Sequence, residues 1–203
     1  MSDIEAYRFE RADRAHTEGL CALFESMGSG CYCNYWHFEG DKNAWLERCY
    51  LHPEQNRLAL QQRLAAPELC GVVALSARTQ ALVGWLKVTR ATAVPRLYDQ
   101  RVYRRLPCFN ASDAERSAVF AAACFVVAAE HRGRGVARGL LDAAIATVRA
   151  HGGSAIEAFP RGAPEGEPLR PDEVWMGPEQ LFVQCGFTRV SDFRPYPVLR
   201  RSL

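Results

Sequence analysis

The chain has 203 residues, of which 48% are hydrophobic and 24% are charged, and its 25 Lys and Arg against 23 Asp and Glu leave a net charge of +2. This composition excludes the disordered, collagenous and coiled-coil classes and is typical of a globular protein that can bury a core. The small net charge disfavours nucleic acid and acidic membranes as partners, because it produces no strong overall field. We expect one domain over residues 1–203, in which any anion site depends on a local cluster of charge.

The sequence predicts a cytoplasmic protein. No apolar run approaches the roughly 18 residues that a membrane span needs, and the N-terminal residues lack both the basic and the apolar part of a signal peptide. We therefore expect no membrane partner. The eight cysteines are spread along a chain that has enough apolar residues for a core, so we expect reduced thiols rather than a disulfide scaffold.

The first part of the chain combines predicted helices with a strand and a hairpin. Asp13 and Asp41 each precede a helical stretch, where an aspartate accepts hydrogen bonds from the first N–H groups, and we expect both to be N-caps. Residues 31–37 carry three aromatic side chains and two thiols, and we expect a loop there. The predicted elements are a strand over 4–9, helices over 13–27, 41–50 and 55–64, and hairpin strands over 70–76 and 81–89.

An arginine-rich stretch without sustained periodicity follows over residues 90–117, and we expect it to be a loop. Its arginines either form a solvated surface or clamp an anion, and the sequence leaves both interpretations open. They are Arg90, Arg96, Arg101, Arg104 and Arg105.

The most apolar run of the chain comes next. Residues 118–127 are almost continuously apolar, which predicts a central strand that is buried on both faces. A helix with one apolar stripe is expected from Val136 to the pair Gly152-Gly153, which ends it. The remaining predicted elements are a strand over 154–159, a loop over 160–178, a short helix over 179–185 and strands over 187–193 and 196–200.

The turn between the apolar strand and the following helix predicts a site for an anion. The first N–H groups of a helix have no intrahelical partner and lie at the positive end of its dipole. Gly133 and Gly135 allow a phosphate to approach the backbone, and Arg132, Arg134 and Arg138 can add charge-assisted contacts. The turn lacks the Gly-Lys-Ser/Thr of a P-loop, and its strand lies in mid-chain, unlike the first strand of a dinucleotide fold.

Residues 132–137, Arg-Gly-Arg-Gly-Val-Ala, resemble the R/Q-x-x-G-x-G/A signature of the GNAT superfamily of acyl-CoA-dependent N-acyltransferases. The preceding strand resembles the family's fourth strand, and residues 181–187, which end in Gly186-Phe187, resemble its late helix and Gly-Phe turn. The resemblance extends over nearly the whole chain. It implies an α/β fold with a mixed, mostly antiparallel central sheet that is splayed between its fourth and fifth strands and flanked by helices.

The resemblance also implies acetyl-CoA as cosubstrate, with its pantetheine arm in the splay between those strands. A neutral primary amine would attack the thioester directly, and an N–H near Val127 would stabilise the oxyanion. The backbone of Phe125, Val126 and Val127 would bind the arm. The residues that would bind the diphosphate are Arg132, Gly133, Arg134, Gly135, Val136, Ala137 and Arg138.

The position of the family's usual proton donor carries no acid here. Many family members have a tyrosine four residues before the glycine of the Gly-Phe turn, and this chain has Phe182 there. The departing thiolate would take its proton from water or from a neighbour such as Cys185, or it would need none. The alternative is that Cys185 has no chemical role and packs in the core.

Glu157 is the expected general base, because an acid inside a strand beside the cleft is costly unless it is paired or used. The alternative is that it faces solvent or pairs with an arginine of residues 90–105. Asp113 and Glu115, which precede the apolar strand, are the reserve candidates.

The resemblance to the family implies that the loop over residues 31–37 lies beside the acceptor cleft, where its aromatic rings could hold a cationic amine by their faces. The competing interpretations are core packing, a nucleophilic pair of Cys33 and His37, and a metal site of Cys31, Cys33 and His37. Three ligands fall short of a structural zinc site, and we expect no metal. The predicted acceptor-binding residues are Tyr32, Tyr35 and Trp36.

Two other functions stay open at this point. The phenylalanine at position 182 favours a non-catalytic acyl-CoA-binding sensor, and Cys31 with Cys33 would suit a metal- or redox-responsive protein. The expected partner of the enzyme is a small-molecule amine. The sequence leaves open which amine is acetylated, the length of the acyl chain and whether the chain forms a homodimer, as members of the family often do.

Overall fold

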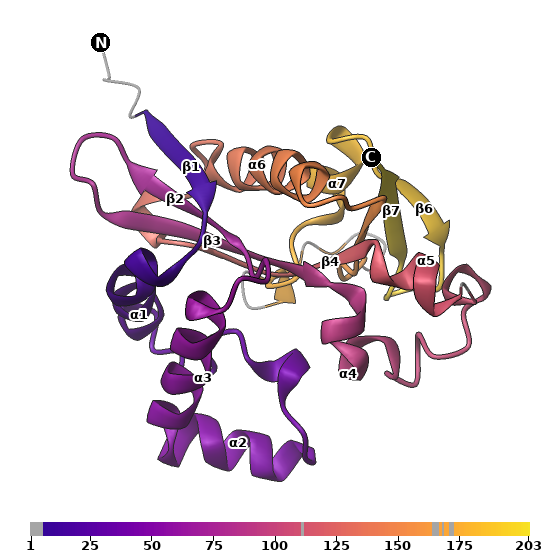
Figure 1. Cartoon of the computed structure of the whole chain (residues 1–203), viewed down its shortest axis with the longest axis horizontal. Coiled ribbons are helices and arrows are strands. Elements are labelled where there is room, and N and C mark those ends of the chain that lie inside the picture. The colour runs from indigo at the N-terminus through magenta and orange to yellow at the C-terminus, as the bar shows by residue number, and fades with distance from the viewer. Residues whose placement is uncertain (1–5, 111, 164–166, 168, 171–172) are drawn as a thin grey trace.

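A seven-stranded sheet with the order β1-β2-β3-β4-β5-β7-β6 forms the centre of the computed structural model (Figure 1). The structure describes residues 6–110, 112–163, 167, 169–170 and 173–203. Neighbouring strands are antiparallel except β4 and β5, which are parallel, so the expected mixed and mostly antiparallel sheet is confirmed. The strands are β1 Tyr7–Arg11, β2 Val72–Ser76, β3 Leu82–Arg90, β4 Val119–Val127, β5 Ala155–Ala158, β6 Thr188–Ser191 and β7 Val198–Ser202.

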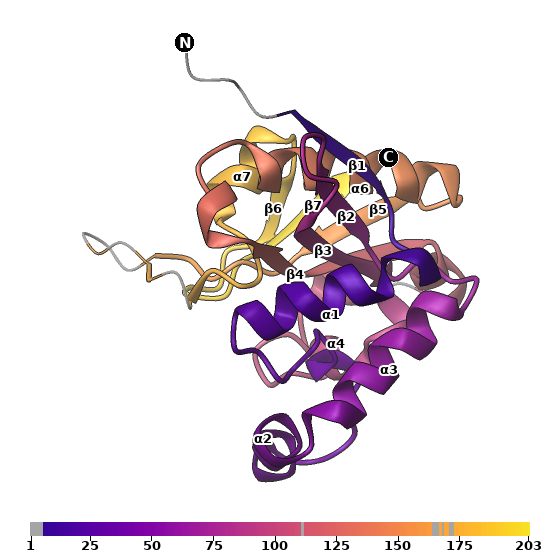
Figure 2. The same ribbon diagram turned by 90° about the vertical axis from the view of Figure 1, so that its left-hand side faces the viewer.

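Helices cover both faces of the sheet. Figures 1 and 2 show α1 to α4 on one side and α6 and α7 on the other. The long helix α6 packs its apolar stripe across β1, β2 and β3, and α1 packs against β3 from the opposite face. The helices are α1 Thr17–Ser26, α2 Lys42–Leu51, α3 Pro53–Ala65, α4 Pro95–Tyr98, α5 Asp113–Ser117, α6 Val136–Ala150 and α7 Glu179–Gln184. Among the helices that the structure describes, none has the length and apolar character to cross a membrane.

Strand β4 is the buried central strand that its apolar sequence predicts, with seven of its nine residues buried. It pairs with β3 along its length, but with β5 only over Val119–Ala122. Two successive residues of β3 pair with Ala122 and Cys124, so Ala123 is the extra residue of a β-bulge in β4. Beyond Ala122, β4 has no strand beside it on the β5 side in the described chain. This is the expected splay between the fourth and fifth strands.

The stretch over residues 90–117 contains more regular structure than predicted. Pro95 begins α4, because its fixed φ suits the first helical position, and Ser112 caps α5 in a capping box with Glu115. Both helices are too short to produce a hydrophobic period, so the sequence pattern missed them. Short 3₁₀ turns are also present at Arg14–His16, Tyr35–His37, Ala91–Ala93, Pro107–Phe109 and Ala129–His131.

Both predicted aspartate caps are confirmed. The side chain of Asp13 accepts a hydrogen bond from the N–H of Ala15, and that of Asp41 accepts one from the N–H of Ala44 at 2.9 Å. At the other end of the chain the predictions are shifted. The last two strands begin at Thr188 and Val198, and the first begins at Tyr7, while residues 4 and 5 of the predicted strand lie outside the described residues.

Asp41 offers a test of these local signals. Asp41→Ala should lower the free energy of unfolding by about 1 kcal/mol, because the first turn of α2 loses its side-chain acceptor. Asp41→Asn keeps a side-chain oxygen at the same place and is the matched control. Urea unfolding of the three proteins measures the difference. Equal losses in both variants would show that the charge of Asp41, rather than the cap hydrogen bond, stabilises α2.

Candidate active site

The turn between β4 and α6 is open to a ligand at two glycines. Gly133 and Gly135 have φ angles of +71° and +82°, a left-handed conformation that side chains other than glycine rarely adopt. A Cβ built on either residue would meet no atom within 4 Å. These glycines are therefore required by the backbone conformation, and the space beside them is free for a ligand.

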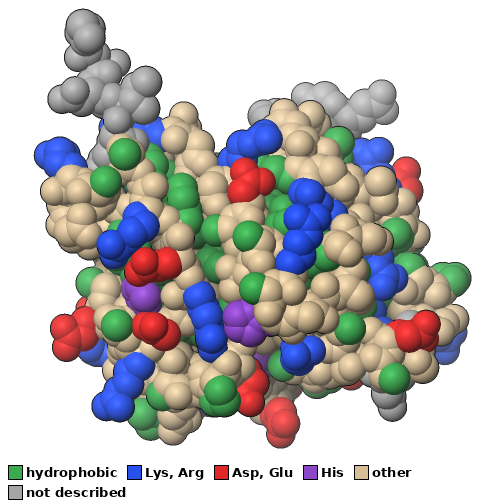
Figure 3. Space-filling view, turned by 45° about the horizontal axis from the view of Figure 1, so that its top comes forward, with side chains coloured by type: hydrophobic (Ala, Val, Ile, Leu, Met, Phe, Trp, Pro, Cys, Tyr) green, Lys and Arg blue, Asp and Glu red, His purple; other side chains and the backbone are tan. Residues whose placement is uncertain are grey.

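The start of α6 gives this turn an uncompensated positive end. Gly135 is the N-cap and offers no side chain, and the first turn contains no acidic residue. The first N–H groups of a fifteen-residue helix therefore have no side-chain cap. Figure 3 shows that Lys and Arg side chains are spread over the upper side of the molecule rather than gathered into one patch. Anion binding would therefore depend on the turn itself and not on a broad positive surface.

A cavity of about 550 Å³ lies beside the open edge of β4, and we call it the β4 cavity. Its walls are largely apolar, and Arg132 of the turn reaches its rim. The residues that give it this character are Phe24, Cys31, Phe125, Val126, Val127 and Trp175. The predicted arm-binding strand and the predicted diphosphate turn therefore border one cavity.

Other groups replace the missing strand along the open edge of β4. The carbonyl of Ala123 accepts from Nε1 of Trp36 at 3.3 Å, and the N–H of Phe125 donates to the carbonyl of Trp175 at 2.7 Å. The carbonyl of Val127 accepts from Nε of Arg132 at 3.0 Å. The N–H of Phe125 is therefore already in use, and of its backbone groups the carbonyl is the one left for the predicted contact with the pantetheine arm.

The N–H of Val127 is the donor that stays available at this edge. Alternate residues of a strand direct their N–H groups to the same side, so the N–H of Val127 points as that of Phe125 does, away from β3. Within the described chain no acceptor binds it. It therefore faces the β4 cavity, where the sequence prediction placed the oxyanion donor.

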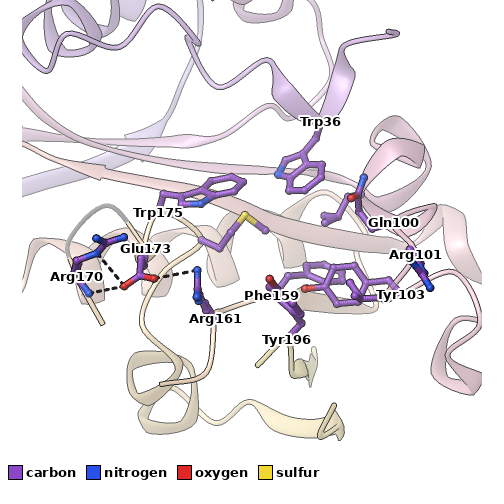
Figure 4. Close-up of a pocket in the computed structure, with 13 residues that line it drawn as sticks. Trp36, Gln100, Arg101, Tyr103, Phe159, Arg161, Arg170, Glu173, Trp175 and Tyr196 are labelled. Atoms are coloured by element: carbon purple, nitrogen blue, oxygen red, sulfur yellow. Dashed lines mark hydrogen bonds and ion pairs between the residues drawn. The ribbon is translucent and has the colours of Figure 1, made fainter. Parts of the chain in front are cut away.

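A second cavity of about 510 Å³ lies beyond Trp175, and we call it the aromatic cavity (Figure 4). The ring of Trp175 stacks on that of Trp36, with centroids 5.7 Å apart and planes at 21°. Trp175 lines both cavities and so forms part of the wall between them. The other ring and thioether groups are Tyr103, Phe159, Met176 and Tyr196, and the charged ones are Arg101, Arg161, Arg170 and Glu173.

The structure brings one of the three predicted acceptor residues to this cavity. Trp36 lines it, whereas Tyr35 lies behind Trp36, with ring centroids 4.7 Å apart, and supports it. Tyr32 points elsewhere: it is buried, and its hydroxyl donates to Glu25. The reason is local, because Tyr32 has a φ of +43° and the chain turns sharply there before the 3₁₀ turn that carries Trp36.

Glu157, the expected general base, lines neither cavity. Its carboxylate is fully buried and accepts from the hydroxyl of Tyr98 at 2.7 Å and from Nη1 of Arg116 at 3.0 Å. Burial, and then the charge of Glu157, raise the pKa of Tyr98 well above its usual value, so Tyr98 keeps the proton that it donates. Tyr98 in turn packs on Phe159, a wall residue of the aromatic cavity, so the base prediction is replaced by a structural ion pair behind that wall.

The reserve candidate Glu115 has no better access. The hydroxyl and N–H of Ser112 lower the pKa of Glu115, because they bind its carboxylate in the cap of α5. The side chain of Asp113 lies outside the part of the chain that is described. Neither cavity includes Glu115 among its described wall residues. Of the candidate bases whose side chains the structure describes, Glu157 and Glu115, neither therefore reaches the site.

The residue at the position of the family's tyrosine packs in the core. Phe182 is fully buried, with its ring 5.8 Å from that of Phe125 and 5.2 Å from that of Phe187. Cys185 is buried as well, which raises the pKa of its thiol. Neither side chain lines the β4 cavity. A departing thiolate would therefore find no acid here.

The cysteine loop shows no metal site within the described residues, where no three His, Cys, Asp or Glu side chains are grouped to hold an ion. Cys31 lines the β4 cavity beside the hydroxyl of Ser29, and burial raises the pKa of its thiol. Cys33 is buried in the core. Burial, with Lys87 and Arg63, lowers the pKa of His37 to about 2, so this histidine is neutral. The loop thus supplies walls and packing to the site.

Comparison with known proteins points to one family. Residues 57–163, more than half of the chain, match the model of the acetyltransferase (GNAT) family. A GCN5-related N-acetyltransferase from Kribbella flavida is similar in structure, with 18% identity, a TM-score of 0.55 and 98% of each chain covered.

Two further solved structures carry ligands. The PaiA N-acetyltransferase from Thermoplasma acidophilum, in complex with coenzyme A, has 7% identity and a TM-score of 0.54 over 98% of this chain and 99% of its own. Diaminobutyrate acetyltransferase EctA from Paenibacillus lautus, with its substrate and coenzyme A, has 13% identity and a TM-score of 0.50 over 97% and 94%. No curated protein sequence matches this chain significantly.

Glu157→Gln distinguishes the structural ion pair from a catalytic base. The substitution should lower the free energy of unfolding by about 3 kcal/mol, because Arg116 is left mostly buried without its counter-charge. The acid limb of the pH–rate profile should keep its position, since Glu157 does not meet substrate. Glu115→Gln removes an exposed carboxylate nearby and is the control. A stable Glu157→Gln protein with a flattened acid limb would restore the role of base.

Proposed function

The chain belongs to the GNAT acetyltransferase family, and on this premise we propose that it transfers the acetyl group of acetyl-CoA to the primary amine of a small molecule bound in the aromatic cavity. One observation carries the proposal. The β4 cavity lies beside the open edge of β4, Arg132 of the glycine turn lines it, and Trp175 borders both this cavity and the aromatic cavity. The described residues contain no comparable grouping of acids, thiols or metal ligands.

Acetyl-CoA is the cosubstrate of this family, and the residues of the turn fit its diphosphate. Gly133 and Gly135 leave room for it, and the uncapped N–H groups of α6 supply donors with a positive dipole. When bound, acetyl-CoA supplies the acetyl group as a thioester. The apolar β4 cavity is the place for the arm that carries it, and the N–H of Val127 is the donor for the thioester oxygen.

The backbone at Val127 would supply much of the electrostatic assistance. Loss of one such donor in an acyl-transfer enzyme raises the barrier by about 3 kcal/mol. The apolar walls around Val127 would strengthen the interaction, because apolar surroundings screen charge less than water does. This donor belongs to the main chain, so it is held in place by the β3–β4 ladder rather than by a side-chain rotamer.

The acceptor amine must reach the thioester without its proton. Of the described residues that line the two cavities, Glu173 alone carries a carboxylate, and Arg161 and Arg170 already bind it. Nearby positive charge and an apolar wall both lower the pKa of a bound amine. The cavity therefore favours the neutral, nucleophilic form of the amine, and we assign no side chain as general base.

Gly135→Asp tests the anion site. The carboxylate would occupy the space of the diphosphate and repel it, so KM for acetyl-CoA should rise about tenfold or more, equivalent to about 1.4 kcal/mol of binding. Gly152→Asp, at the other end of α6, is the matched control, because Gly152 also has a positive φ of +71° and open space beside it. Equal effects on KM would contradict diphosphate binding at the turn.

Acetyl transfer itself is tested by two measurements on the full chain. Acetyl-CoA should raise the apparent melting temperature, as any ligand of the folded state does in proportion to RT ln(1 + [L]/Kd). Release of free thiol should then depend on added amine. Binding of acetyl-CoA without thiol release for any amine of a broad panel would favour the non-catalytic sensor. The phenylalanine at position 182, where the family usually has an acid, is consistent with that alternative. Absence of binding would contradict both.

A further inference from the structure

Among the described residues that line the aromatic cavity, arginines outnumber acids. Arg101, Arg161 and Arg170 line it together with one acid, Glu173. Glu173 lies 3.0 Å from Nη1 of Arg161 and 3.4 Å from Nε of Arg170, so its charge is balanced within the wall, as the dashed lines in Figure 4 show. Arg101 is an exposed residue that lines the cavity on the other side in that view, and its side chain forms no ion pair or hydrogen bond with another described residue.

We propose that the acceptor is an amine that also carries an anionic group, a carboxylate or a phosphorus acid, and that the Arg101 guanidinium binds this group. The inference rests on the proposed acetyl transfer and names its substrate class. A guanidinium presents two parallel N–H groups that match the two oxygens of such an anion. A polyamine or another polycation would meet the positive guanidinium of Arg101 in the same place and would be repelled.

The walls between the charged ends suit a small organic body. Trp36, Tyr103 and Phe159 are buried and offer ring faces and edges to the cavity (Figure 4). Burial, and then Tyr196, raise the pKa of Tyr103, so its phenol is neutral and does not cancel the charge of Arg101. A cavity of about 510 Å³ has the size of a small-molecule site.

The arrangement also orients the acceptor. Arg101 and Trp175 lie on different sides of the cavity in Figure 4, and Trp175 borders the β4 cavity. An acceptor whose anion meets Arg101 can therefore turn its amine toward the thioester. Arg161 adds a second donor, because its Nε is buried and meets no acceptor among the described residues, although its Nη1 binds Glu173.

Matched acceptors test the substrate class. Phenylalanine and 2,4-diaminobutyrate are each compared with the corresponding carboxamide and with the decarboxylated amine, and a phosphonate analogue of each acid distinguishes carboxylate from phosphorus acid. We expect kcat/KM for at least one anionic amine to exceed that of its neutral or cationic counterparts about tenfold or more, the effect of one charge-assisted contact. Acetylation that prefers the decarboxylated amines would overturn the inference and leave the proposed transfer intact.

Arg101→Gln tests the assigned residue. KM for the preferred anionic amine should rise about tenfold, while KM for its carboxamide and for acetyl-CoA should not change. Arg104→Gln is the matched control, since Arg104 is an exposed arginine close by in the chain and does not line the cavity. Equal changes in both variants would attribute the effect to overall charge and would refute the contact with Arg101.

If the enzyme acetylates none of these amines, acetyl transfer is refuted for this panel. Binding of the same amines then tests whether the aromatic cavity holds an anionic group. The same series is titrated by calorimetry in the presence of coenzyme A. Binding of an acid by the wild-type protein that is lost in Arg101→Gln but kept in Arg104→Gln would support the anion subsite. No detectable binding of any anionic amine would overturn it.

Discussion

The arrangement of this protein depends on a buried strand that loses its neighbour halfway. Strand β4 keeps β3 on one side, but β5 accompanies it only as far as Ala122. Pro160 follows close behind β5 and has no N–H to extend a ladder, and the bulge at Ala123 bends β4 at the same level. Backbone groups that are buried without partners are costly, so the freed edge of β4 must be satisfied by something else.

The substitutes for the missing strand create the site. Trp36 and the segment at Trp175 approach this edge from two distant parts of the chain, and their rings then form a wall of the aromatic cavity. Arg132 of the glycine turn donates to the last residue of β4 and so links the end of the strand to the turn. One structural requirement, hydrogen bonds for a single strand edge, thereby brings the glycine turn, the N–H of Val127 and the aromatic cavity close together.

Local signals made the frame of this site predictable, and long-range pairing made the rest unpredictable. The apolar run of β4, the stripe of α6, the caps at Asp13 and Asp41 and the glycines of the turn each express a short-range rule. The partner of Glu157 instead depends on sheet register and on the short helices that present Tyr98 and Arg116. The position of the Tyr32 side chain was not predictable, because the chain turns there through a positive φ that tyrosine rarely adopts. The charged wall of the aromatic cavity comes from stretches that the sequence marks only as loops.

The charge balance of that wall matters for the chemistry. The N–H of Arg170, and then Arg161, lower the pKa of Glu173, so its carboxylate stays ionised while the arginines cancel its field. An unpaired carboxylate at the same place would stabilise the acceptor as an ammonium ion, which cannot attack a thioester. Paired as it is, Glu173 would offer the proposed acceptor little uncompensated negative charge to hold a proton on its amine. In the proposed reaction, the arginines that would bind an anionic group would therefore also favour the neutral amine.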